Sequence, residues 1–235
     1  MKKETITLLL ICVAAFAQQK GSFTDTRDKK TYKTVKIGKQ TWMAQNLDYH
    51  GEDGNLGSCY NNEPENCKKY GRLYDWVTAM NIDTKFEREK LDSSDVKHQG
   101  VCPEGWHLPS KEEWQTLVDF AGGNDVSGKK LKAKSGWNGK CKKGEENIRS
   151  DRMKVINNTN NCGTDNYGFS ALPGGTINSV VSIFAGDEGY WWSSSDDNDG
   201  RAYFRYMHYN NDNEERNRHG IYYKGNQSSV RCIKD

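Results

Sequence analysis

The chain has 235 residues, a formal net charge of +2 and a mean hydropathy of −0.96, with seven tryptophans and twelve tyrosines. This aromatic content excludes a disordered chain, which would lack the side chains for a core. The balanced charge excludes a typical nucleic-acid-binding protein, which would present a strongly basic surface.

The first residues are organised like a secretory signal peptide. Lys2 and Lys3 precede a short apolar stretch, and Ala15–Ala17 has the small residues of a cleavage site. The stretch is too short to span a bilayer, and no later segment could do so. A lipoprotein anchored through Cys12 is a weaker alternative, because the apolar run continues past that cysteine. We expect an extracytoplasmic protein, secreted or on the cell surface, with a signal peptide at 1–17, a flexible leader at 18–27 and one domain at 28–235.

The predicted elements of the domain begin with a β-hairpin. Tyr32–Ile37 and Gln40–Met43 are rich in β-forming residues, and Gly38-Lys39 separates them as a turn. Residues His50–Lys69 are expected to form a loop. Apolar side chains at helical spacing then predict a helix over Leu73–Met80.

The clearest local pattern predicts a second helix after Ser110. Ser110 can cap the free backbone N–H groups of the helix, and Glu113 three residues later completes a capping box. Gly122-Gly123 is expected to end the helix, and a short helix follows near Lys129–Lys134. The apolar face of the second helix consists of Trp114, Leu117, Val118 and Ala121.

Strands return late in the chain. They are expected at Tyr190–Ser194, Arg201–Met207, Gly220–Lys224 and Ser229–Ile233. A strand pair, two helices, long loops and a strand meander follow one another in this order. Such an order predicts an α+β fold whose first and last strands pair in one antiparallel sheet.

Six cysteines remain once Cys12 is assigned to the signal peptide. An even number in an exported chain indicates disulfides, although six cysteines allow fifteen pairings. Short local loops favour Cys59–Cys67 and Cys141–Cys162, which leaves Cys102–Cys232. A zinc site is the rival interpretation, but no C-x-x-C or H-x-x-x-H pattern supports it.

Several short segments, spread over nearly the whole chain, carry a family resemblance. They read QTWMAQNL at 40–47, YGRLYDW at 70–76, CPEGWHLP at 102–109, YGFSALPGG at 167–175, YWWSS at 190–194 and SVRCI at 229–233. In this order they resemble the Fibrobacter succinogenes major paralogous domain, a bacterial secreted family, over about Asp25–Asp235. The family is functionally uncharacterised, so the resemblance implies a domain without naming an activity.

A more distant resemblance concerns the fold. Leu108-Pro109 and Glu113-Trp114, followed far downstream by Val230-Arg231-Cys232, are similar to the formylglycine-generating-enzyme and C-type-lectin-like group. This resemblance implies an α+β domain with paired terminal strands, two helices and long functional loops. It also implies the bridge Cys102–Cys232.

Catalytic chemistry finds little support in the sequence. The formylglycine-generating enzymes use two closely spaced cysteines near the C-terminus, since thiolates suit Cu(I), but Cys232 stands alone here. Asp187-Glu188 and Glu214-Glu215 are adjacent acids, whereas glycoside hydrolysis needs opposed carboxylates. We interpret these acids as surface charge and predict no catalytic residue.

A calcium site is a weak alternative. Asp196–Gly200 offers oxygen ligands, with Asp197 and Asp199 as candidates, but Tyr206 occupies the position where a bidentate Glu belongs. We interpret the stretch as a turn between strands. No cofactor is expected, with calcium as the one open alternative.

The preferred hypothesis is a non-catalytic module that binds a polysaccharide or a surface protein through aromatic side chains. Trp191 and Trp192 are adjacent in a strand and point to opposite faces, so one of them is expected in the core. A diverged enzyme and a structural or adhesive surface component are the alternatives. The candidate binding residues are Trp191, Trp192, Tyr203, Tyr206, Tyr209 and Tyr222, with Arg201, Arg205, Arg218 and His219 for polar contacts.

Overall fold

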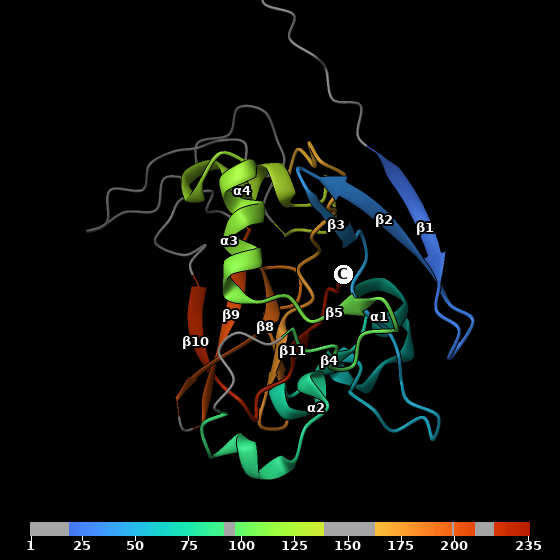
Figure 1. Ribbon diagram of the computed structural model, residues 1–235, viewed down its shortest axis with the longest axis vertical. Coiled ribbons are helices and arrows are strands. Elements are labelled where there is room, and N and C mark those ends of the chain that lie inside the picture. Colours follow the sequence, from blue (N-terminus) through green and yellow to red (C-terminus); the bar gives the residue numbers. More distant parts are fainter. Residues whose placement is uncertain (1–18, 92–96, 139–162, 199, 210–218) are drawn as a thin grey trace, which may run out of the picture.

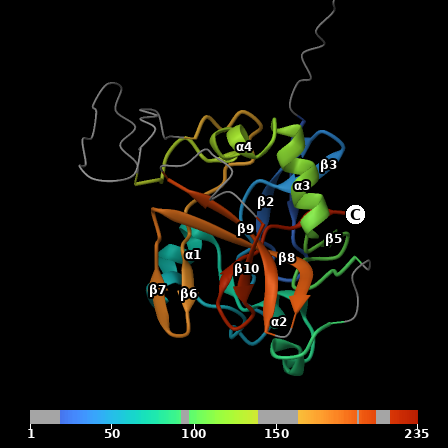
Figure 2. The same ribbon diagram turned by 90° about the vertical axis from the view of Figure 1, so that its left-hand side faces the viewer.

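The computed structural model describes residues 19–91, 97–138, 163–198, 200–209 and 219–235. Over these ranges the chain forms an α+β fold with two five-stranded sheets, a two-stranded hairpin and short helices (Figures 1 and 2). The expected signal peptide and bridge Cys141–Cys162 lie outside the described residues, as do Asp199, Arg218 and Glu214-Glu215.

The first sheet contains the predicted hairpin and both ends of the described chain. Its order is β1 (Lys20–Thr24), β2 (Thr31–Ile37), β3 (Gln40–Met43), β12 (Ile233–Lys234) and β5 (Trp106–His107). All neighbours are antiparallel, which confirms the pairing of early and late strands. Lys20–Thr24, expected within a flexible leader, instead forms β1, because Phe23 packs on Trp106 with 4.8 Å between ring centroids.

The second sheet contains the predicted meander. Its order is β10 (His219–Tyr223), β9 (Arg201–His208), β8 (Glu188–Asn198), β11 (Ser228–Ser229) and β4 (Leu73–Tyr74). The expectation of a single sheet and of one strand over Ser229–Ile233 was wrong. That segment divides, because Ser229 pairs with Trp191 in one sheet and Ile233 pairs with Trp42 in the other. Residues 230–232 therefore cross between the sheets.

The helix after Ser110 is confirmed as α3 (Lys111–Phe120), with both hydrogen bonds of the capping box present. Helix α4 (Asn124–Leu131) follows it and starts earlier than the short helix expected near Lys129–Lys134. Helix α2 (Trp76–Met80) is shorter than predicted, since the Asp75 side chain accepts from Thr78 N and caps it there. The predicted loop at 50–69 contains helix α1 (Pro64–Tyr70). The 3₁₀ turns are η1 (Tyr60–Asn62) and η2 (Thr84–Glu87).

The core lies between the two sheets and helix α3. Trp42, Trp114 and Trp191 meet there, with ring centroids 4.7 Å apart for the first pair and 6.4 Å for Trp114 and Trp191. A hairpin of β6 (Thr176–Asn178) and β7 (Val181–Ile183) lies beside the second sheet, as Figure 2 shows. No helix of the described residues is long and apolar enough to cross a membrane.

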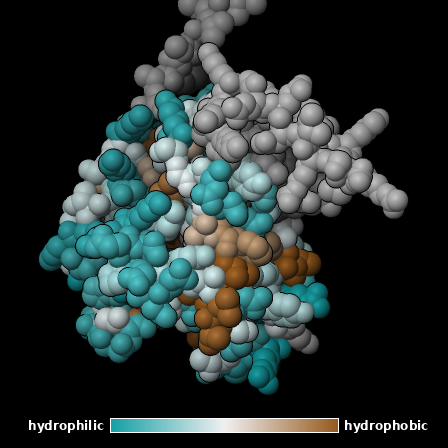
Figure 3. All heavy atoms as spheres, turned by 180° about the vertical axis from the view of Figure 1, so that it is seen from behind, coloured by the Kyte–Doolittle hydropathy of each residue, from teal (hydrophilic) through white to brown (hydrophobic). Residues whose placement is uncertain are grey.

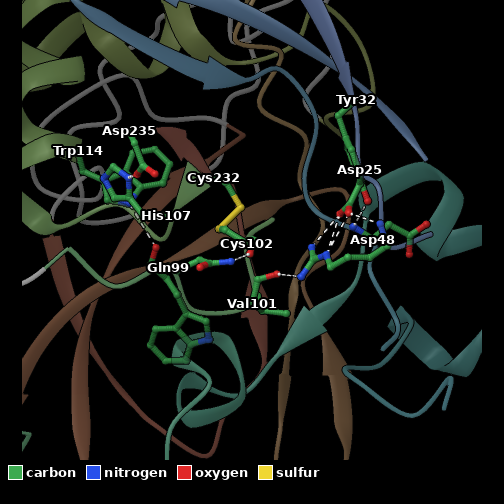
Figure 4. The surroundings of a disulfide bond; sticks show 12 residues. Asp25, Tyr32, Asp48, Gln99, Val101, Cys102, His107, Trp114, Cys232 and Asp235 are labelled. Carbon is green, nitrogen blue, oxygen red and sulfur yellow. Dashed lines mark hydrogen bonds and ion pairs between the residues drawn. A yellow bond between two sulfur atoms is a disulfide. The ribbon is translucent and has the colours of Figure 1, made fainter. Parts of the chain in front are cut away.

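Two disulfides lie within the described residues, and both match expected pairs. Cys59–Cys67 joins the 3₁₀ turn η1 to helix α1 across a sequence separation of 8. Cys102–Cys232 spans 130 residues and is fully buried. Figure 4 shows this second bridge between His107 and Asp235 on one side and Asp25 and Asp48 on the other. It ties the crossing segment at 230–232 to the segment that leads into β5.

Candidate functional site

The two tryptophans proposed as ligand contacts are both fully buried. The Trp191 indole N–H donates to Asn46 Oδ1 at 2.8 Å, and the Trp192 indole N–H donates to the Tyr74 carbonyl at 2.7 Å. They do point to opposite faces of β8, but each face is covered, one by α3 and the other by Tyr74 and Trp76. Neither ring can stack on a ligand without opening the core.

Asn46 is the polar centre of the junction between the sheets. Its Oδ1 accepts from Trp191 and from Nε and Nη2 of Arg231, at 3.0 and 2.6 Å for the arginine. Its amide donates to the Tyr70 carbonyl at 2.7 Å and to Ser229 Oγ at 3.2 Å. One side chain thus joins four parts of the chain, its own segment and those of Tyr70, Trp191 and residues 229–231, which gives the motif residues Asn46 and Arg231 a structural role.

Arg231 is a buried cation whose hydrogen-bond acceptors are all neutral groups. Besides Asn46, it donates to the carbonyls of Phe169 and Ser170, and it lies 4.4 Å from the Phe169 ring centroid. Burial lowers the pKa of Arg231 to about 9, and the charge of Asp165 partly offsets this. No ion pair to Arg231 is formed within the described ranges.

A tyrosine face on the second sheet is the best candidate for the aromatic binding site. The register places Tyr190 opposite Tyr206, with Glu188 at the end of the same face. The Tyr206 hydroxyl donates to Glu188 Oε1 at 2.7 Å, and the Tyr190 hydroxyl donates to Glu188 Oε2. His208 lies 3.7 Å from the same carboxylate. Glu188 was interpreted as surface charge, which was wrong, because its side chain is only 13% exposed.

Tyr222 extends this face onto the edge strand β10. Its ring stacks on Tyr190 with centroids 5.6 Å apart, and like Tyr206 it is half-exposed. Burial, together with the charge of Glu188, raises the pKa of Tyr222 even though its hydroxyl is hydrogen-bonded to Thr176. That hydrogen bond places the β6–β7 hairpin next to the tyrosine face.

The β6–β7 hairpin carries exposed apolar side chains. Val180, Val181 and Phe184 are among the most exposed large hydrophobic residues described. Figure 3 shows hydrophobic side chains of this kind gathered within the otherwise hydrophilic rear surface. Phe184 has a φ of 68°, a left-handed conformation that is costly for a bulky residue. Such strained, exposed apolar positions are typical of sites that contact a partner.

The other polar candidates do not gather at this face. Arg205 points to the opposite side of β9, where it is 1% exposed and Nη2 donates to Asn124 Oδ1 at 3.3 Å. Burial lowers the pKa of Arg205 to about 10 despite the charge of Asp119. His219 begins β10 opposite Arg205, and Tyr209 lies next to His208 with centroids 4.5 Å apart.

Two further candidates, Tyr203 and Arg201, lie on that opposite side near the edge strand. The ammonium of Lys111 covers the Tyr203 ring at 4.6 Å, and Arg201 lies 5.5 Å from the Tyr223 ring centroid. Tyr223 is 63% exposed and offers the most accessible tyrosine of this surface. Because cations already cover these rings, the surface suits stacking less well than the tyrosine face.

The acidic stretch interpreted as a turn instead begins in the last part of β8, where it has a structural role. Asp196 forms a buried ion pair with Lys224 at 3.0 Å and accepts from the backbone N–H of Leu91. Asp197 belongs to β8 and joins no cluster, since no group of three or more potential metal ligands is found among the described residues.

A charged cluster closes one end of the first sheet. Both ring nitrogens of His107 are hydrogen-bonded to carboxylates, to Asp235 at 2.6 Å and to Glu113 at 2.9 Å (Figure 4 shows His107 and Asp235). Burial opposes the charged imidazole, but the two acids outweigh it and raise the pKa of His107 above 6.5. Burial likewise opposes ionisation of Glu113, yet His107 and the Ser110 N–H lower its pKa. The cluster anchors Asp235, and sequence reasoning missed it.

Comparison with known proteins places the chain in a family but not among characterised relatives. No curated protein and no solved structure matches it significantly. The family model described as the Fibrobacter succinogenes major domain matches residues 35–234. This range starts within strand β2 and includes β3, the Asn46–Arg231 junction and the tyrosine face. The chain therefore belongs to the Fibrobacter succinogenes major domain family.

Proposed function

We propose that the chain is an extracytoplasmic, non-catalytic module that binds a polysaccharide through the tyrosine face formed by Tyr190, Tyr206, Tyr222 and Glu188. The observation that carries the proposal is a carboxylate fixed by two tyrosine hydroxyls beside two half-exposed rings. Flat aromatic rings suit the apolar faces of sugars, and a fixed carboxylate accepts hydrogen bonds from sugar hydroxyls. The exposed β6–β7 hairpin would extend the contact along a polymer.

The proposal also includes secretion and a C-type-lectin-like fold. Two disulfides favour an oxidising compartment, in agreement with the signal-like residues 1–17. We assign the fold to the C-type-lectin-like kind because β3 and β12 pair early and late strands and Cys102–Cys232 ties the late segment. Calcium remains an alternative to be tested alongside.

The test is a screen of the disulfide-bonded protein against plant and bacterial polysaccharides, with and without calcium, followed by calorimetry on each ligand found. Tyr222→Ala should weaken binding about tenfold or more, because it removes a stacking ring. Tyr223→Ala is the matched control, since it lies on the same strand and points to the other side. Tyr206→Phe keeps the ring but releases Glu188, and should weaken binding less than Tyr222→Ala.

Two outcomes would contradict the proposal. One is that the folded protein binds none of the polysaccharides. The other is that Tyr222→Ala and Tyr223→Ala affect binding equally. Circular dichroism and the melting temperature of each variant establish that the comparison concerns folded proteins.

A further inference from the structure

A cleft of about 500 Å³ opens between the first sheet, the end of helix α1 and residues 165–172. It is formed by elements other than those of the tyrosine face. Its lining contains five lysines and two aspartates, a surplus of three positive charges on a chain whose overall charge is nearly balanced. The lysines are Lys20, Lys30, Lys33, Lys68 and Lys69. Positive charge is therefore concentrated where the surface is concave.

The two aspartates, already subtracted in this surplus, are both engaged by other groups. The Asp48 carboxylate pairs with Lys30 and also with Arg72, whose Nε lies 3.6 Å away, so two cations share its single negative charge. The Asp165 carboxylate accepts from the backbone N–H of Ser170 at 2.8 Å and from its hydroxyl at 2.7 Å. Across the described ranges, Lys33 and Lys69 form no ion pair.

A buried positive charge lies behind the lining of the cleft. Asn46 and Ser170 line the cleft, and both accept hydrogen bonds from Arg231, which is not itself part of the lining. Arg231 is fully buried and its hydrogen bonds end on neutral oxygens. A buried cation without a carboxylate partner is costly, and an anion bound above it would reduce that cost. The buried guanidinium is an observation independent of the surface lysines.

The remaining lining groups indicate which kind of anion fits. Thr31, Thr34, Gln45 and Ser170 supply hydroxyl and amide groups, and side chains such as Ala44, Tyr70 and Leu172 add apolar surface. A cleft of this size accommodates a small organic molecule, and its hydroxyls and amides match a ligand rich in hydroxyl groups. A bare inorganic ion would leave most of these groups unused.

We propose that the cleft binds an acidic saccharide, with the anionic group of the sugar between Lys33 and Lys69 above Arg231. The anionic group is a carboxylate, as in a uronic acid, or a phosphate ester. Both have the oxygen atoms that lysine ammonium groups and neighbouring hydroxyls recognise. This site is additional to the tyrosine face and recognises charge, where the tyrosine face recognises the flat side of a sugar ring.

Calorimetry on the full-length disulfide-bonded protein tests the proposal with three probes. Trigalacturonate carries carboxylates, its methyl ester is the same sugar without the charges, and mannose 6-phosphate carries a phosphate ester. We expect binding of trigalacturonate or mannose 6-phosphate and none of the methyl ester. The probe that binds identifies the anionic group. Binding should weaken as salt is added, because the lysines are exposed.

Charge reversal of two lysines that form no ion pair across the described ranges, Lys33 and Lys69, locates the site. Lys33→Glu with Lys69→Glu should weaken binding of the acidic probe by about tenfold or more. Lys36→Glu with Lys39→Glu is the matched control. Both residues are exposed and lie on the same hairpin as Lys33 but outside the lining, and the change in net charge is identical.

Three results overturn the proposal. The first is no binding of either acidic probe. The second is binding of the methyl ester as strong as that of trigalacturonate. The third is equal weakening by the cleft pair and the control pair, which would mean attraction to overall charge alone. All four substituted lysines are exposed, so loss of folding is not expected to obscure the comparison.

Discussion

Replacing Asn46 with alanine should be among the most destabilising single changes in the chain. The change leaves Arg231 Nε and the Trp191 indole N–H without the one acceptor that each has among the described residues, and Nη2 keeps just a 3.5 Å contact with Ser170 O. A buried unsatisfied donor costs about 1–3 kcal/mol, and more when it is charged. Two to three such donors give a loss of about 3–6 kcal/mol. Domains of this kind have about 5–15 kcal/mol in total.

Two variants separate this cause from a general sensitivity of the segment. Gln45→Ala alters the exposed neighbour and should cost less than about 1 kcal/mol. Asn46→Asp keeps the acceptor and supplies Arg231 with a carboxylate, but it loses the amide donations to Tyr70 O and Ser229 Oγ. We therefore expect its stability to lie between that of the wild type and that of Asn46→Ala.

Urea unfolding without reductant, followed by tryptophan fluorescence, measures these differences, because the m-value reveals any change in the surface exposed on unfolding. A loss below about 1 kcal/mol for Asn46→Ala at unchanged m would refute the hydrogen-bond account given above. It would mean that water entering from the cleft replaces the amide oxygen.

Two more predictions concern the disulfides and the response to pH. Replacing both cysteines of one bridge with alanine should lower the free energy of unfolding by about 5 kcal/mol for Cys102–Cys232, which spans 130 residues, and by about 2.5 kcal/mol for Cys59–Cys67, which spans 8. Urea unfolding that gave the reverse order would contradict the loop-entropy account. The raised pKa of His107 gives stability that is present below about pH 6.5 and lost as the pH rises through the folded-state value, whereas the lowered pKa of Glu113 gives stability present above about pH 4.5 and lost on further acidification. The cluster should therefore stabilise the fold most between those pH values. His107→Gln should flatten the dependence of the melting temperature on pH. Calorimetry at several pH values would contradict this if the variant kept the dependence of the wild type.

Elements whose determinants are local could be predicted from the sequence. The hairpin over β2 and β3 follows from β-forming residues on either side of Gly38, whose φ of 60° the turn requires. Helix α3 follows from Ser110 and Glu113, which are three residues apart and cap each other. Helix α1 could not be predicted in this way, because only Cys67 and Tyr70 are buried in it and no apolar period results.

Features that depend on contacts between residues far apart in the chain could not be predicted from the sequence. Asn46 and Arg231 are 185 residues apart, and nothing in the residues next to either of them indicates that the two side chains meet. Glu188 is adjacent to another acid and looks solvent-exposed until Tyr206 folds across the β8–β9 turn to meet it. Trp192 enters the core because the central strand β8 is covered on both faces, which alternation along one strand cannot reveal. Tyr206 and Tyr222 remain candidate binding residues because they lie away from the buried centre of the sheet.

The position of β12 sets an order of events during synthesis. Ile233 and Lys234 follow every other element along the chain, yet they lie between β3 and β5 in the middle of the first sheet. As the chain emerges residue by residue, β1–β3 and β5 have no strand to join them until residue 234 is available. Cys102 must likewise await Cys232. The first sheet and the buried bridge thus both stay incomplete until residues 232–234 are available, so the early strands depend for their closure on a segment far along the chain.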